Sequence, residues 1–133
     1  MVTDIEETEW KLRCELAACH RLFHHFGWTD VIWTHLSVRL PQNKNQYLIT
    51  PYGLMFEEVT ASNLVKVDFQ GNILEGKSYM DAGHAIHTAI MKTRQDVNCT
   101  LHSHTRAGIA VSCMKEGLMN LSQQSGEVQD KIS

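Results

Sequence analysis

The chain has 133 residues, 43% of them hydrophobic and 20% charged, which suits one domain with a packed core. Its formal charge of −3 excludes a general nucleic-acid binder, and its apolar runs are too short to span a membrane. The four cysteines form no C-x-x-C pair and stand among apolar neighbours, so we expect buried free thiols. The acidic N-terminus lacks the apolar run of a signal peptide, and a cytoplasmic protein is expected.

The chain begins with the pattern of an amphipathic helix. Apolar residues recur at steps of three and four, which predicts a helix over residues 4–26. Thr3 and Glu6 have the spacing of a capping box at its start. Gly27 follows as the residue that ends the helix.

A series of antiparallel strands is expected next. Residues 31–40 are rich in β-branched and aromatic side chains, and polar turn residues separate them from a second strand over 47–50. Residues 64–69 alternate between apolar and polar, so the odd-numbered residues share one face. After a turn, residues 73–74 are expected to pair back onto that strand.

The second half of the chain mixes helices and strands. We expect a helix over residues 81–94, a strand over 97–104, a helix over 106–115 and a strand over 118–121. Ile86 and Ile90 would share one face of the first of these helices. The order of elements predicts a sheet covered by helices, of α/β or α+β type. We expect one domain over residues 1–125 and a polar tail over 126–133.

The histidines are the main candidates for chemistry. His102 and His104 fall in the predicted strand, where alternate side chains share a face with Cβ atoms about 6–7 Å apart. Two imidazoles at that spacing can bind one divalent cation, although an H-x-H pattern also arises by chance. His20, His24 and His25 lie near the end of the first helix, where capping and surface packing are expected.

Two further groups of histidines have alternative interpretations. His84 and His87 lie one helical turn apart and are either metal ligands or part of a face packed on the sheet, which we favour. His35 shares a strand face with Ser37. It is either a half-buried, hydrogen-bonded residue or part of a site.

Several segments together resemble the class II aldolase/adducin family, in that family's order and over nearly the whole chain to about residue 125. They are residues 22–28, 34–39, 48–60, 68–72, 82–90, 94–98 and 102–105. The resemblance implies a three-layer sandwich in which helices cover both faces of a mostly antiparallel sheet. It also implies a homo-oligomer with sites at subunit boundaries.

The resemblance implies metal chemistry as well. In the sugar-phosphate aldolases and epimerases of this family, a zinc ion held by three histidines stabilises the enediolate that forms when a carbon–carbon bond breaks. His102 and His104 match two of these ligands, for zinc or another divalent metal. The residues that match substrate-binding positions, for a small hydroxy-carbonyl or sugar-phosphate substrate, are His35, Ser37, Tyr52, Gly53 and Asp81.

The chain also departs from the enzymes of the family. Their Ser-Ser-Glu run, which supplies the acid/base glutamate and phosphate-binding serines, is matched here by Asp81-Ala82-Gly83. No histidine follows His104 to serve as a third metal ligand. These departures resemble the adducin-like branch, which includes a cytoskeletal protein. We therefore expect a domain truncated at its C-terminus: a metal-dependent lyase or epimerase with an incomplete site, a non-catalytic interaction module, or an inactive remnant.

Overall fold

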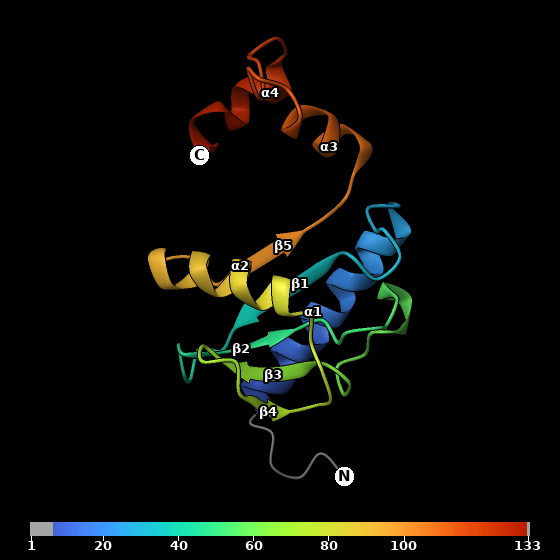
Figure 1. The fold of residues 1–133 in the computed structure, drawn as a ribbon, viewed down its shortest axis with the longest axis vertical. Helices are drawn as coiled ribbons and strands as arrows, with labels where there is room; N and C mark the ends of the chain where they lie inside the picture. The colour runs from blue at the N-terminus through green and yellow to red at the C-terminus, as the bar shows by residue number, and fades with distance from the viewer. Residues whose placement is uncertain (1–6, 133) are drawn as a thin grey trace. The chain divides into compact units, whose positions relative to one another are not determined.

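The computed structural model describes residues 7–132, and the chain divides into two units, Met1–Ser103 and His104–Ser133 (Figure 1). The first unit contains α1 (Glu7–His25), β1 (His35–Arg39), β2 (Gln46–Ile49), the 3₁₀ helix η1 (Phe56–Glu58), β3 (Val65–Asp68), β4 (Ile73–Glu75), α2 (Asp81–Thr93) and β5 (Cys99–His102). The second contains α3 (Arg106–Ser112), α4 (Gln123–Val128) and the 3₁₀ helix η2 (Gln129–Lys131).

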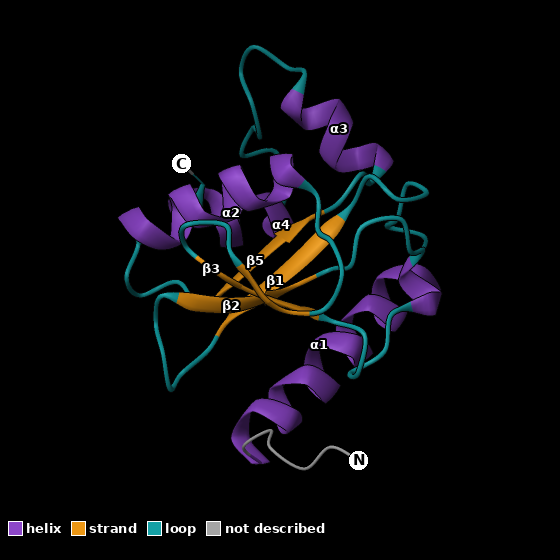
Figure 2. Cartoon of the chain, turned by 60° about the horizontal axis from the view of Figure 1, so that its bottom comes forward, coloured by secondary structure: helices purple, strands orange, loops and turns teal. Residues whose placement is uncertain are grey.

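The five strands form one sheet in the order β4-β3-β2-β1-β5, with every neighbouring pair antiparallel. The pairing of β1 with β2 confirms the hairpin expected from the sequence. In Figure 2, α1 and α2 lie on opposite faces of this sheet. The result is the predicted α/β sandwich, with a helix layer on each side of an antiparallel sheet.

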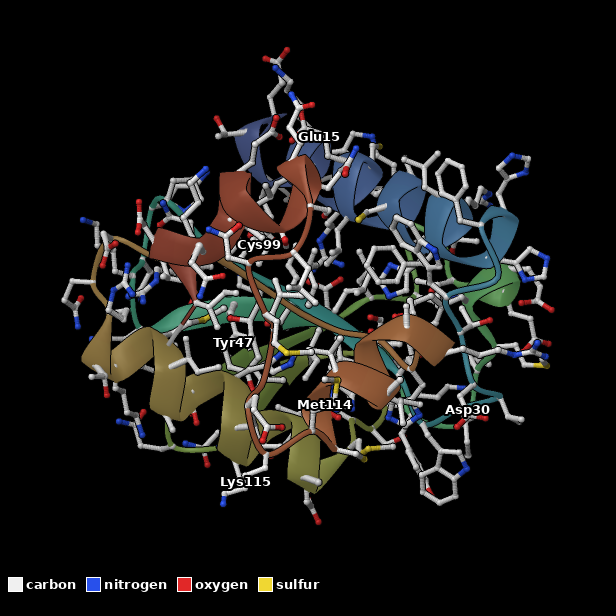
Figure 3. The ribbon with its side chains drawn as sticks, turned by 90° about the horizontal axis from the view of Figure 1, so that it is seen from above. Glu15, Asp30, Tyr47, Cys99, Met114 and Lys115 are labelled. Carbon is white, nitrogen blue, oxygen red and sulfur yellow. The ribbon has the colours of Figure 1, made fainter. Side chains whose placement is uncertain are left out.

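Alternation along the strands assigns residues to the two faces. In β1, Leu36 and Val38 belong to the core shared with α1, while the residues between them face α2. The α2 side has its own apolar cluster, which includes Tyr47 of β2 (labelled in Figure 3) and Met91 of α2. The odd-numbered residues of β3 also lie in this cluster, as the alternation predicted.

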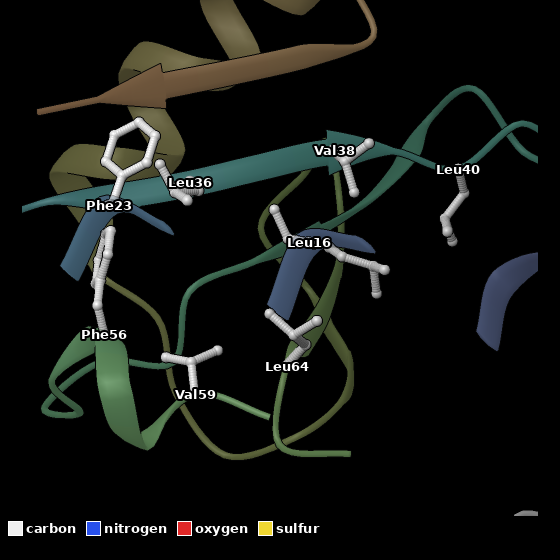
Figure 4. Packing of buried hydrophobic residues seen from close by; sticks show 9 residues of the cluster. Leu16, Phe23, Leu36, Val38, Leu40, Phe56, Val59 and Leu64 are labelled. Carbon is white, nitrogen blue, oxygen red and sulfur yellow. The ribbon is translucent and has the colours of Figure 1, made fainter. Parts of the chain in front are cut away.

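The core on the α1 side joins α1 to the sheet and to η1. Figure 4 shows its side chains converging from these elements. The cluster consists of Leu16, Phe23, Leu36, Val38, Leu40, Leu48, Phe56, Val59 and Leu64. Each such side chain contributes about 1.5–3 kcal/mol when it is fully removed from water, so this layer fixes α1 against β1 and β2.

The end of α1 follows the sequence prediction. Gly27 has a φ of +67°, a left-handed conformation that glycine adopts without steric cost. Its N–H donates to the carbonyl of His24 at 3.0 Å, and the N–H of Trp28 donates to the carbonyl of Phe23 at 2.9 Å. These two bonds satisfy carbonyls that the helix would otherwise leave unpaired. The expected capping box at Thr3 and Glu6 lies outside the described residues.

Several expected boundaries differ from the structure. The strand expected over 97–104 ends at His102, because the backbone leaves the sheet before α3. Residues 118–121 form no strand, since this irregular segment pairs with no other strand in the described chain. Residue 125 lies inside α4, and the domain boundary expected after it stays a prediction.

Ile86 and Ile90 share one face of α2, as expected, and that face is exposed, while Gly83, His87 and Met91 lie toward the sheet. One prediction about burial is wrong. The cysteines are free as expected, but three of them are exposed and Cys19 is only half-buried. Apolar neighbours in sequence do not determine which face of a helix or strand carries a residue. Among residues 7–132, no helix is long and apolar enough to cross a membrane.

Candidate functional site

The site begins on the α2-facing side of β1. Every second residue of β1 faces this side of the sheet. These residues are His35, Ser37 and Arg39, and all three are buried. Buried polar side chains need hydrogen-bond partners. Arg39 donates to the carbonyl of Met91 at 2.5 Å, which leaves His35 and Ser37 to meet the helix at His87.

His87 joins the two polar residues of β1. Its Nδ1 lies 2.7 Å from the hydroxyl oxygen of Ser37, and its Nε2 lies 3.0 Å from Nδ1 of His35. Burial lowers the pKa of His87 to about 3, with help from the electrostatic influence of His35 and His102. A neutral imidazole has one N–H, so His87 donates one of these bonds and accepts the other. Ser37, His87 and His35 thus form a buried relay.

The pairing of β1 with β5 adds His102 to this cluster. His35 and His102 stand opposite each other in the antiparallel register, with ring centroids 4.8 Å apart and nearly parallel planes. The relay therefore ends at His35, whose ring stacks on His102, the last residue of β5. The two strands are far apart in the sequence, so only the sheet topology brings these rings together.

Gly83 lets α2 approach this cluster. A Cβ atom at position 83 would lie 3.1 Å from the His35 ring, closer than ordinary packing allows. The His35 imidazole therefore occupies the space that a side chain at position 83 would need. A side chain at position 83 would therefore require the His35 ring to move.

The two expected metal ligands are placed differently from the prediction. His102 is the last residue of β5, whereas His104 follows the end of the strand and begins the second unit. Within residues 7–132, no group of three or more His, Cys, Asp or Glu side chains could hold a metal ion. The donors in this described part of the chain therefore do not make a complete zinc site, which normally has at least three protein ligands.

Two expected substrate-binding residues meet in an open pocket. The pocket has a volume of about 420 Å³ and is lined by Trp33, Tyr52, Tyr79, Met80, Asp81 and Ala82. We call it the aromatic pocket. Gly53 lies in the turn beside Tyr52 with a φ of +84° and is not one of the lining residues. Ser37 is fully buried, with its hydroxyl against His87.

The favoured interpretation of His87, a helix face packed on the sheet, is confirmed, since His87 is buried with Gly83 and Met91 on one stripe of α2. Its bonds to Ser37 and His35 were not foreseen.

Two aromatic residues of the pocket were missed. Trp33 and Tyr79 carried no motif. Their contribution depends on a pocket formed by segments that are distant in sequence, so a pattern of spacing cannot reveal it.

Comparison with known proteins agrees with this architecture. Residues 14–133 match the family model described as the Class II Aldolase and Adducin N-terminal domain. A Pseudomonas aeruginosa protein whose name places it in aldolase class 2 is 50% identical over 131 residues, which are 97% of this chain and 50% of that protein. Alpha-adducin from Rattus norvegicus is 44% identical over 92% of this chain and 18% of its own length.

Solved structures give the same result. An aldolase II superfamily protein from Pseudomonas syringae has a TM-score of 0.89 and 45% identity, over 95% of this chain and 52% of that one. The L-fuculose 1-phosphate aldolase from Glaciozyma antarctica PI12 has a TM-score of 0.85 and 32% identity, over 98% of this chain and 54% of that one. The chain thus spans about half the length of these structures and of the P. aeruginosa protein.

Proposed function

Because the chain belongs to the class II aldolase and adducin N-terminal domain family, we propose that it forms part of a metal-dependent lyase or epimerase. Its substrate would be a small hydroxy-carbonyl compound. The observation that carries this proposal is the stacking of His35 on His102 at the end of a buried relay. The first turn of α2 links this cluster to the aromatic pocket, since Asp81 lines the pocket and Gly83 packs against His35.

We assign His102 and His104 as two ligands of a divalent metal such as zinc. Residues 7–132 show no group of three or more His, Cys, Asp or Glu side chains that could hold a metal ion, so we assign no third ligand. A bound metal of this kind supplies a Lewis acid that stabilises negative charge on a substrate oxygen. The relay from Ser37 through His87 would fix the orientation of His35, and Tyr52 and Asp81 would contact the distal part of the substrate.

Homo-oligomeric assembly in the cytoplasm forms part of the same proposal. Leu22, Phe26 and Trp28 are 54%, 55% and 41% exposed near the end of α1, and the rings of Phe26 and Trp28 stack at 5.1 Å. Exposed apolar groups of this size are common where subunits meet. The free cysteines suit a reducing compartment.

Cobalt binding tests the metal assignment. Co²⁺ should bind measurably, and His102→Ala or His104→Ala should each weaken binding at least about tenfold, because each removes one of the two assigned ligands. His25→Ala is the matched control, since His25 is an exposed histidine at the end of α1. Isothermal titration calorimetry and the cobalt absorption spectrum provide the readout. Cobalt binding of unchanged strength in both ligand variants would refute the assignment.

The similarity to alpha-adducin supports a second candidate, a non-catalytic interaction module. The contact between Gly83 and His35 also favours it, because it leaves no room for a carboxylate side chain at position 83. This candidate predicts a folded protein with no specific cobalt binding and no turnover. Retro-aldol cleavage or epimerisation in a panel of small hydroxy-carbonyl compounds, with metal supplied, would exclude it.

A further inference from the structure

The aromatic pocket has an unusual lining for a site that would bind a sugar phosphate. Trp33, Tyr52 and Tyr79 contribute three aromatic side chains, and Asp81 contributes a carboxylate. None of the six described lining residues is basic. A phosphate dianion would meet a negative charge here and no cationic partner, so the lining disfavours it.

The same lining favours a positive charge. The face of an aromatic ring carries negative electrostatic potential and attracts ammonium groups, most strongly at tryptophan. A carboxylate beside such rings adds a direct ionic attraction. The pKa of Tyr79 is raised, first by burial and second by the negative charge of Asp81. The charge of Asp81 is therefore felt by another residue that lines the pocket.

Backbone and side-chain bonds hold the pocket walls in place. The N–H of Tyr52 donates to the carbonyl of Ser78 at 3.0 Å, which ties the segment after β2 to the segment before α2. The hydroxyl of Tyr79 donates to the carbonyl of Gly71 at 2.8 Å. The first bond fixes the backbone of the pocket wall, and the second fixes the Tyr79 ring, which therefore loses little conformational freedom when a ligand binds.

Trp33 is presented by a strained turn. Its N–H donates to the carbonyl of Asp30 at 2.9 Å, and Val31 inside this turn has a φ of +49°. A β-branched residue in the left-handed region is strained, and such strain is concentrated at binding sites. Trp33 is 54% exposed, so this large aromatic residue is accessible to a ligand.

The basic residue in the segment before α2, Lys77, lines a different cavity. Lys77 lines a second pocket of about 410 Å³, which shares only Tyr52 with the aromatic pocket. Lys77 is absent from the lining of the aromatic pocket in the described structure. The two cavities therefore differ in charge, and the negative one contains the cluster of rings.

From these observations we propose that the aromatic pocket binds the ammonium group of a small organic cation. Its volume of about 420 Å³ suits a small molecule. As a statement about substrate, this rests on the proposed function: the end of the substrate distant from the reacting carbons would carry an ammonium group. The binding itself needs neither a metal nor turnover, so it is tested separately.

Choline and its neutral carbon isostere 3,3-dimethylbutan-1-ol are the probes, because they have the same shape and differ in charge. Titration calorimetry should show choline binding at least about tenfold more tightly than the neutral compound. Inorganic phosphate at the same concentration should not displace choline. Asp81→Asn and Trp33→Leu should each weaken choline binding about fivefold or more.

Asp96→Asn is the matched control, because Asp96 is an exposed aspartate paired with Arg94 and does not line the pocket. It should leave choline binding unchanged. Circular dichroism verifies that each variant is folded, and the exposed Trp33 provides a second variant if Asp81→Asn fails to fold. Equal binding of choline and its neutral isostere, or preferential binding of phosphate, would overturn the proposal. Choline binding without any cobalt binding would uphold it while the proposed metal function failed.

Discussion

At the residue scale, the histidines of α1 occupy very different environments. His20 is fully buried, with Nδ1 2.8 Å from the carbonyl of Leu16 and Nε2 2.8 Å from the hydroxyl of Thr50. A carbonyl only accepts, so Nδ1 carries the proton and Thr50 donates to Nε2. By contrast, His24 is half exposed beside Glu57. The expectation of surface packing for His20 was therefore wrong, because its position on α1 faces the sheet.

The free energy of unfolding should decrease as the pH is lowered, because His20 is buried in its neutral form. Burial lowers its pKa to about 4 from an ordinary value of 6.5. Above pH 6.5 both the folded and unfolded states are neutral. Between pH 6.5 and 4 only the unfolded state gains a proton, so the free energy of unfolding should drop by about 2 kcal/mol from pH 7.5 to pH 5 through His20. Urea denaturation at the two pH values measures this change.

His20→Gln should reduce that pH dependence, and His25→Gln, at an exposed position of the same helix, should not. Part of the dependence should persist in His20→Gln, since His87 also has a lowered pKa. An unchanged pH dependence in His20→Gln would contradict the assignment of a neutral, buried His20.

At the element scale, an ionic network attaches α1 to the edge of the sheet. Arg13 is fully buried and donates to Glu9 at 3.0 Å and to Glu75 of β4 at 2.7 Å. Lys66 of β3 donates to the second oxygen of Glu9 at 2.7 Å. Removing one member of a buried network leaves a charge without its partner, which costs far more than losing an exposed pair.

Arg13→Ala should lower the free energy of unfolding by about 3 kcal/mol, because Glu9 and Glu75 lose a buried partner. Lys11→Ala is the control, since the pair of Lys11 with Glu15 is 4.0 Å long and exposed. That variant should change stability by less than about 0.5 kcal/mol. Denaturant unfolding followed by circular dichroism measures both. A loss below about 1 kcal/mol for Arg13→Ala would show that the network does not anchor α1.

At the scale of the whole molecule, the two units differ in how much they bury. The first has two apolar clusters, one on each face of the sheet. Among the described residues 104–132, Ser125 is the one buried residue, and Leu121 is 79% exposed. A segment with few buried apolar side chains gains little stability from packing and opens at low free energy.

Hydrogen exchange should therefore separate the two units. Amides in β1, β2 and β3 should exchange at least about a hundredfold more slowly than those in α3 and α4, because strand opening requires loss of the core. Mass spectrometry of peptic fragments measures both sets in one experiment. Protection in α4 equal to that in β2 would contradict this expectation.

The sequence by itself determined the features that depend on local periodicity. The steps of three and four in α1, the left-handed glycine at its end and the alternation of β3 each follow from backbone geometry and appear in the structure. The joint pattern of several motifs also indicated the family that the comparisons show. The placement of His102 and His104 as metal ligands stays a prediction.

Only the tertiary structure decided which residues meet. His35 stacks on His102 because β1 and β5 pair in one register, and His87 reaches both His35 and Ser37 because Gly83 allows α2 to lie close to the sheet. The aromatic pocket likewise joins Trp33 to Tyr79 and Asp81 across a long stretch of chain. Periodicity reports which face a residue occupies within its own element. Contacts between elements depend on register and packing distance, which no local pattern contains.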